Sequence, residues 1–181
     1  MRYLGKRWLA PAIAAATLAE QLPRRYEQTC QPKLIVAGLA IAPEVVLDLS
    51  GELLAGKSTT ILLSPGLSAD AWYYLLAVLN SRLIGYYYRQ VFQGDSLGNG
   101  YLRMGPPQLR SLPIVPPTCQ PGSLEQKIAL AAQQVAGLAE QRTTQVGVEL
   151  KAKIDRWVER HYGLSDAESE FLANCARKQH P

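Results

Sequence analysis

Cysteine and histidine are scarce in this 181-residue chain, which has three cysteines and two histidines. Cys30, Cys119 and Cys175 lie far apart and form no Cys-x-x-Cys pair, while His161 and His180 both lie near the C-terminus. A disulfide framework or a four-ligand zinc site therefore lacks suitably spaced ligands, and we expect no metal site. Free thiols favour a reducing compartment, so we expect a cytoplasmic protein.

Long apolar runs are also missing, because no stretch reaches the ~18 residues that a transmembrane helix needs. We therefore expect no membrane partner. A basic start followed by an alanine-rich run over residues 8–19 has the outline of a signal peptide, but Pro11 interrupts it, and we favour a folded amphipathic segment. Because 48% of the residues are hydrophobic and 19% are charged, the chain can bury a core, and its length fits one domain or one domain with an appendage.

Hydrophobic spacing predicts an α+β fold. Short aliphatic runs at residues 33–37, 44–49 and 59–63 indicate strands, which we expect in an antiparallel meander. Apolar residues at spacings of three and four predict one helix from residue 68 to about residue 91, and residues 112–115 suggest a short edge strand. Together these patterns predict a twisted, mostly antiparallel sheet of roughly five strands with flanking helices.

The last third of the chain is predicted to be helical. Ser123 is a typical N-cap, and it precedes an apolar seam made of Leu124, Ile128, Ala131, Val135 and Leu138. Ser165 and Glu168 have the spacing of a capping box for a final short helix. We divide the chain into an α+β region, residues 1–117, and a helical region, residues 118–181. We expect the seam to fold back onto the sheet.

A phosphate-binding motif appears at residues 51–58, which read Gly-Glu-Leu-Leu-Ala-Gly-Lys-Ser and satisfy the P-loop pattern. A P-loop aims a helix N-terminus at the phosphates, but the residues that follow here read as a strand ended by Pro65. We therefore favour a hairpin turn with Gly51 and Gly56 as turn residues, and we keep nucleotide binding as an alternative.

Catalysis finds little support in the residue pattern. Gly-Pro-Pro-Gln at residues 105–108 faintly resembles the Asn-Pro-Pro-Tyr of adenine-N6 methyltransferases, but glycine cannot accept the hydrogen bond that the asparagine accepts. No glycine-rich loop for S-adenosylmethionine follows a strand, and no serine or cysteine has an evident histidine base. We expect no catalytic residue and no cofactor in this chain.

A glycine-rich, polar loop follows the long predicted helix and has side chains suited to reading base edges. Glutamine and asparagine can bind adenine, arginine can bind guanine, and tyrosine or serine can hold a phosphate. A solvated surface loop is the simpler interpretation. The residues in question are Arg89, Gln93, Ser96, Asn99, Tyr101 and Arg103.

Several fragments of the chain, taken in order, form a combination that is more specific than any one of them. They are Pro-Lys-Leu-Ile-Val at residues 32–36, the aspartate-ended strand before Gly-Lys-Ser, Tyr-Leu-Leu-Ala-Val-Leu-Asn-Ser at residues 74–81, the loop containing Tyr101, and Leu-Pro-Ile at residues 112–114. The tail adds Ile-Asp-Arg-Trp-Val at residues 154–158 and Tyr-Gly-Leu-Ser-Asp-Ala-Glu at residues 162–168. Together these fragments resemble the TaqI-like C-terminal specificity domain of restriction-modification proteins, and the resemblance spans nearly the whole chain.

This resemblance implies a target recognition domain, which reads a DNA sequence for an adenine-N6 methyltransferase or a fused type IIG enzyme. The implied partners are double-stranded DNA and a methyltransferase, possibly with an endonuclease, and S-adenosylmethionine is expected only in that methyltransferase. Gly56, Lys57 and Ser58 would then form a turn of the domain. The candidate DNA-binding residues are Lys6, Arg7, Lys33, Lys57, Arg89, Gln93, Ser96, Asn99, Tyr101 and Arg103.

The formal net charge of +4 is unevenly distributed. Residues 1–33 contain six basic and two acidic groups, residues 81–117 contain four and one, and residues 118–181 contain eight of each. Two positive stretches beside a neutral tail suit a DNA-facing edge on a structural base. A P-loop nucleotide-binding protein and a structural docking domain remain the alternatives.

Overall fold

The structure is a computed structural model that describes residues 2–3, 6–7, 13–95, 100–138 and 145–177. Its strands are β1 (Arg2–Tyr3), β2 (Lys6–Arg7), β3 (Lys33–Ala37), β4 (Leu39–Ala40), β5 (Val45–Asp48), β6 (Thr59–Leu63) and β7 (Leu102–Arg103). Its helices are α1 (Ala15–Gln21), α2 (Pro23–Thr29), α3 (Ala69–Leu79), α4 (Arg82–Phe92), α5 (Pro106–Arg110), α6 (Leu124–Gly137), α7 (Gln145–His161) and α8 (Asp166–Arg177), with a 3-10 turn η1 (Gln93–Asp95). The fold is α+β and mostly helical, with small antiparallel sheets.

The largest sheet has three strands in the order β5-β3-β6, with β3 antiparallel to both neighbours. β3 takes the centre because Leu34 and Val36 are fully buried there. The predicted meander is therefore wrong, since it would place residues 44–49 in the middle. The loop that contains the Gly-Lys-Ser sequence does not close a hairpin, because it crosses from edge strand β5 to edge strand β6.

The expected sheet of roughly five strands is divided into smaller pieces over the described residues. β1 pairs with β2, and β4 pairs with β7, each as a two-stranded ribbon. Residues 112–115 do not form the predicted edge strand. The main chain of Val115 instead uses tyrosine hydroxyls: its N–H donates to Tyr162 (3.2 Å) and its carbonyl accepts from Tyr74 (3.3 Å). The neighbouring prolines lack N–H groups, which prevents a continuous strand ladder here.

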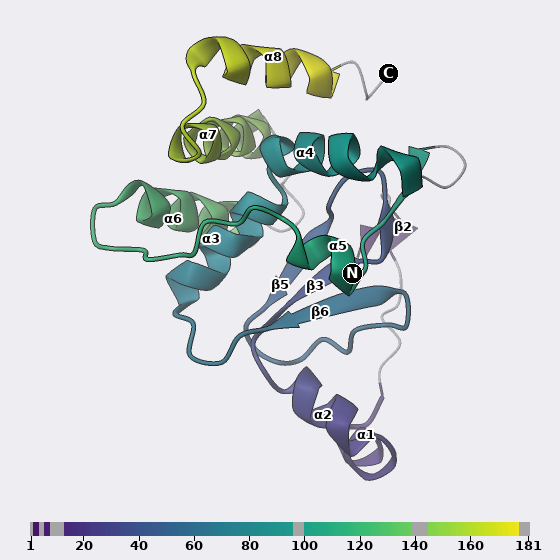
Figure 1. Cartoon of the computed structure of the whole chain (residues 1–181). Coiled ribbons are helices and arrows are strands. Elements are labelled where there is room, and N and C mark those ends of the chain that lie inside the picture. Colours follow the sequence, from purple (N-terminus) through teal and green to yellow (C-terminus); the bar gives the residue numbers. More distant parts are fainter. Residues whose placement is uncertain (1, 4–5, 8–12, 96–99, 139–144, 178–181) are drawn as a thin grey trace.

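The helix expected from residue 68 to about residue 91 is two helices, α3 and α4, which take different directions (Figure 1). Ser81 caps α4, because its hydroxyl accepts the N–H of Ile84 (3.2 Å). The side chain of Asn80 accepts the N–H of Val45 (2.9 Å) and donates to the carbonyl of the same residue (3.0 Å). Short polar side chains such as these form hydrogen bonds with main-chain groups and can thereby end a helix. The spacing of apolar residues does not show this break, because it continues through residues 80 and 81.

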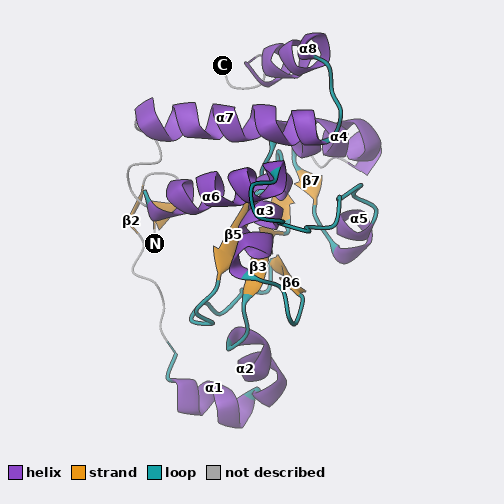
Figure 2. Ribbon diagram, turned by 90° about the vertical axis from the view of Figure 1, so that its left-hand side faces the viewer, coloured by secondary structure: helices purple, strands orange, loops and turns teal. Residues whose placement is uncertain are grey.

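The C-terminal helices stack outward from the sheet. α3 contacts the sheet, α6 packs on α3, α7 packs on α6, and α8 contacts α4 (Figures 1 and 2). The helix beginning after Ser123 and the capping box of Ser165 and Glu168 are both confirmed. The expectation that the apolar seam folds onto the sheet is wrong, because α3 lies between. Buried Ile128 and small Ala132 allow α6 to approach α3 closely.

One core joins the two regions that we separated at residue 117. It contains Leu34 and Val36 of the sheet, Val78 of α3, Ile128 of α6 and Val158 of α7, all of them fully buried. The burial of these side chains against one another provides the main stabilisation of the fold. The position of the boundary between the two regions stays a prediction.

A buried ion pair joins the ends of β3 and β5. The ammonium of Lys33 donates to the carboxylate of Asp48, and both side chains are 1% exposed. Lys33 also donates to the carbonyl of Thr29 at the end of α2 (2.6 Å). Because the pair satisfies groups from the helix and two strands, its loss would leave a buried charge without a partner.

The two members of this pair should differ in their effect on stability. D48N leaves the Lys33 ammonium buried without a counter-charge, so the free energy of unfolding should fall by about 3–5 kcal/mol. K33M leaves a carboxylate that still accepts several N–H groups, so the loss should be smaller, roughly 1–3 kcal/mol. Urea unfolding of the two variants measures both values. An equal loss of unfolding free energy in the two variants, or a larger loss in K33M, would contradict the role of Asp48 as the counter-charge of buried Lys33.

Two carboxyls predict how stability depends on pH. Burial raises the pKa of Asp48 and of Glu125, but the hydrogen bonds from Lys33 to Asp48, and from Thr118 and Cys119 to Glu125, outweigh it, so each pKa lies below its usual range. Because the unfolded carboxyls titrate near pH 4, this stability is complete above about pH 5 and is lost as the pH falls through the lower folded values. Urea unfolding at several pH values should show the decline, and D48N should flatten it. If the free energy of unfolding fell as steeply with pH in D48N as in the wild type, Asp48 would be excluded as a source of the pH dependence.

Candidate nucleic-acid interface

The loop that reads as a P-loop does not have the geometry of one. Residues 51–58 lead into strand β6 rather than a helix. The N–H groups of Gly51, Glu52 and Leu53 donate to the carboxylate of Asp48, at 3.0, 3.3 and 2.9 Å. These donors therefore already bind an anion that belongs to the protein, whereas a P-loop would offer them to a phosphate. The exposed Lys57 lies at the other end of the loop.

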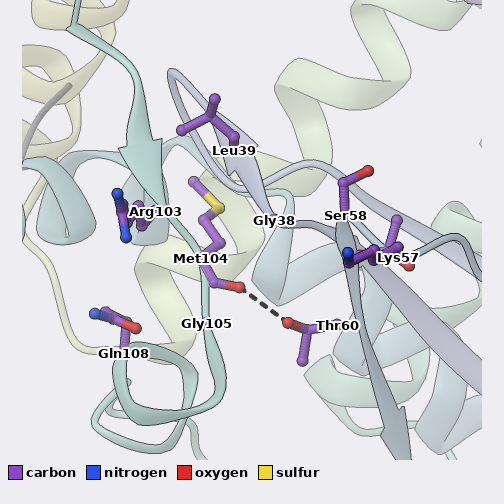
Figure 3. A pocket seen from close by; sticks show the side chains of 10 residues that line it. Gly38, Leu39, Lys57, Ser58, Thr60, Arg103, Met104, Gly105 and Gln108 are labelled. Carbon is purple, nitrogen blue, oxygen red and sulfur yellow. Dashed lines mark hydrogen bonds between the residues drawn. The ribbon is translucent and has the colours of Figure 1, made fainter. Parts of the chain in front are cut away.

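An open groove of about 550 Å³ lies beside Lys57, between the start of β6 and the segment that follows β7 (Figure 3). We call it the basic groove. In Figure 3, Lys57 and Ser58 lie on one side, while Arg103 and Gln108 lie on the other. Lys57 and Arg103 are predicted DNA-binding residues that lie 46 positions apart in the sequence, and they line the same groove.

Main-chain contacts hold the walls of the basic groove together. The N–H of Gly38 donates to the carbonyl of Ser58 (2.8 Å), and the carbonyl of Gly38 accepts the N–H of Met104 (3.0 Å). The hydroxyl of Thr60 donates to the carbonyl of Met104 (3.2 Å), as the dashed line in Figure 3 shows. Gly38 joins β3 to β4, and both of its main-chain polar groups help to connect the sheet to the β4–β7 ribbon.

The basic groove has a positive charge. Lys57 and Arg103 are exposed, and among the described residues that line the groove there is no aspartate or glutamate. Gln108 adds an amide, and Ser58 adds a hydroxyl. Cations combined with neutral donors and acceptors can hold phosphate oxygens and read base edges at the same site.

Three further predicted residues lie outside the lining of the groove. Tyr101 is 41% exposed and directly precedes β7, and Gln93 is exposed at the end of α4. Arg89 is half-buried on α4, the helix that contacts α8. Burial lowers the pKa of Arg89, although Cys175 of α8 and Tyr86 partly counteract this effect. The structure therefore places Tyr101 next to a wall of the groove and places Arg89 towards α8.

The prediction that Lys33 contacts a DNA phosphate is wrong. Its side chain is buried and bound to Asp48 and to the carbonyl of Thr29, so it cannot reach a ligand on the surface. A lysine at the start of a strand does not reveal from sequence alone whether it lies on the solvent side. The aspartate that ends the neighbouring strand was the available signal, because opposite charges at strand ends can pair.

Four predicted DNA-binding residues lie outside the described part of the chain, either whole or with their side chains. Ser96 and Asn99 lie outside the described residues. Lys6 and Arg7 form the short strand β2, but their side chains lie outside the described part of the chain. Their roles in DNA binding stay predictions.

Gln108, Ser58 and Gly38 are site residues that the sequence reasoning missed. Gln108 lies on α5, which begins with the two prolines of the Gly-Pro-Pro-Gln sequence that we compared only with a methyltransferase motif. Pro-Pro is a recognisable start of a short helix, because proline is favoured at the first helical position. The pairing of β4 with β7, which brings Gly38 close to Met104, had no sequence signal because each strand has only two residues.

The described residues show neither a membrane span nor a metal site. No helix among them has the length and apolar character needed to cross a membrane. Nor do three or more histidine, cysteine or acidic side chains gather where a metal ion could bind them, as far as the chain is described.

Comparison with known proteins adds no family. No protein-family model matches the chain, and a search of curated proteins finds no match. The resemblance to the specificity domain therefore stays a prediction, and arguments about function depend on the residues of the chain itself.

Gly38 provides a test of the groove architecture. A Cβ at this position would lie 2.5 Å from the carbonyl oxygen of Ser58, which is main chain and cannot rotate away. G38A should therefore lower the free energy of unfolding by about 1–3 kcal/mol and separate the walls of the groove. G56A, where a Cβ meets nothing within 4 Å, is the matched control and should change stability by less than about 0.5 kcal/mol. Thermal or urea unfolding measures both, and a G38A protein as stable as G56A would refute the close contact.

Proposed function

We propose that this chain recognises a DNA target for a restriction-modification methyltransferase and binds that DNA at the basic groove. The observation that carries the proposal is that Lys57 and Arg103 line opposite sides of one open groove (Figure 3). An unpaired positive surface of this kind attracts phosphates, and the attraction steers a duplex to the site.

The side chains of the groove divide into two roles. Lys57 has a compact ammonium that suits a phosphate, which it would contact without regard to sequence. Arg103 and Gln108 have planar groups that can bind a base edge with two hydrogen bonds, arginine to guanine and glutamine to adenine. The exposed ring of Tyr101 next to β7 can add contact with the sugar-phosphate backbone.

The chemical step is assigned to a separate methyltransferase domain or subunit, possibly accompanied by an endonuclease. The chain would supply target selection, and the partner would bind S-adenosylmethionine. The described lining of the basic groove supports a binding role for this chain, because it contains cations, an amide and hydroxyls. Free Cys30, Cys119 and Cys175 fit the reducing cytoplasm in which such a system would operate.

The two charged residues of the groove should respond differently to substitution. K57Q should weaken binding to all duplexes and reduce the slope of log affinity against log salt by about 1, because one phosphate contact is lost. R103Q should also reduce the preference for one base pair, by about 1–3 kcal/mol. Fluorescence anisotropy with a mixed-sequence duplex measures the first effect, and selection from a randomised duplex pool followed by titration measures the second.

Controls separate this function from its alternatives. K127Q removes an exposed lysine on α6, away from the groove, and should leave the salt slope unchanged. Equal effects of K127Q and K57Q would mean that net charge alone drives binding. Absence of duplex binding by the wild-type chain at low salt would overturn the proposal, and a structural docking domain would replace it. Binding of Mg-ATP that K57Q abolishes would favour a nucleotide site instead.

A further inference from the structure

The two faces of α7 differ sharply in charge. Ile154 and Val158 are buried in the core, and the acidic residues Asp155 and Glu159 lie on the same inner side, buried as well. The carboxylate of Glu159 accepts hydrogen bonds from the guanidinium of Arg82, one of them at 2.7 Å. Asp155 accepts the main-chain N–H of Arg82 (3.0 Å) at the start of α4. The acids on the C-terminal half of α7 therefore have internal partners.

Three basic residues on the outer side of α7 differ from these acids. Lys153, Arg156 and Arg160 are exposed, and no ion pair forms to any of them within the described residues. Trp157, half-buried, lies among them, and the ammonium of Lys153 is 4.7 Å from the centre of its ring. The formal neutrality of residues 118–181 thus conceals a positive surface on the C-terminal half of α7, because Asp155 and Glu159 are buried on its inner side.

These four side chains line a hollow of about 720 Å³ between α7 and the start of α8, which we call the α7–α8 hollow. Figure 2 shows α7 lying along the upper part of the molecule with α8 beyond it. Ser165 and Ser169 add hydroxyls, and Asp166 is the one acid among the lining residues that the structure describes. Three cations against one carboxylate leave a net positive charge around a flat aromatic ring.

We propose that the α7–α8 hollow is a second binding site for the phosphate backbone of DNA, separate from the basic groove. This inference rests on the proposed function, because it assumes that a duplex is the ligand. Lys153 and Arg160 are seven residues apart, or roughly 10 Å along the helix, a length over which one DNA strand presents about three phosphates. Arginine forks match phosphate oxygens, and the ring of Trp157 can lie against a sugar or an unpaired base.

The test compares two double variants of the full chain in duplex binding. R156Q/R160Q should reduce the salt slope by about 2 and lower affinity at least about tenfold at moderate salt, because roughly two phosphate contacts are lost. K127Q/K151Q removes the same number of charges from exposed positions on α6 and α7 outside the hollow, and should change neither quantity. Thermal unfolding verifies that both variants fold. Equal effects of the two variants would overturn the inference.

Parallel substitutions distinguish this inference from the proposed function. Loss of binding in K57Q/R103Q with none in R156Q/R160Q would refute the α7–α8 hollow and leave the basic groove as the DNA site. The reverse result would refute the basic groove and support the hollow. No duplex binding by the wild-type chain refutes both. Binding of a polyglutamate peptide that R156Q/R160Q abolishes, with duplex binding unchanged, would assign the hollow to an acidic protein and overturn the inference.

Discussion

The ion pair between Lys33 and Asp48 is the interaction on which the arrangement of the N-terminal half depends. It joins the first residue of the central strand to the last residue of an edge strand, and Lys33 also binds the end of α2. The carboxylate of Asp48 also accepts hydrogen bonds from the N–H groups at the start of the loop that leads to Lys57. A charge buried for structural reasons therefore shapes the loop whose far end reaches the basic groove.

The parts of the fold that depend on residues close together in the sequence could be predicted. The aliphatic runs became β3, β5 and β6, and Ser123 and Ser165 begin helices as their spacing indicates. The order of the strands and the packing of α6 on α3 depend on contacts between distant segments, which period and capping do not encode. The break at Asn80 shows the same limit, since its side chain bonds to Val45 on a separate strand.

The candidate site was predictable only in part, for a similar reason. Lys57 and Arg103 stood out because they are basic and lie in polar, glycine-containing segments, yet nothing local indicated that a two-residue ribbon would bring them together. Lys33 has the same chemistry but lies inside the protein. The positive side of α7 was concealed by counting charges along the chain, because Asp155 and Glu159 cancel Arg156 and Arg160 in a sum but not in space.

The segment around Arg103 is anchored by the buried side chains of Leu102 and Met104 and by hydrogen bonds of its main chain. The hydroxyls of Tyr88 and Thr60 bind the carbonyls of Arg103 and Met104, and Gly38 binds the N–H of Met104. None of these contacts involves the side chain of residue 103. The hydrogen bonds that position residue 103 are therefore independent of its side chain. The side chain can be exchanged while the fold is kept. In the proposed function, a single substitution at position 103 would therefore change which base is read.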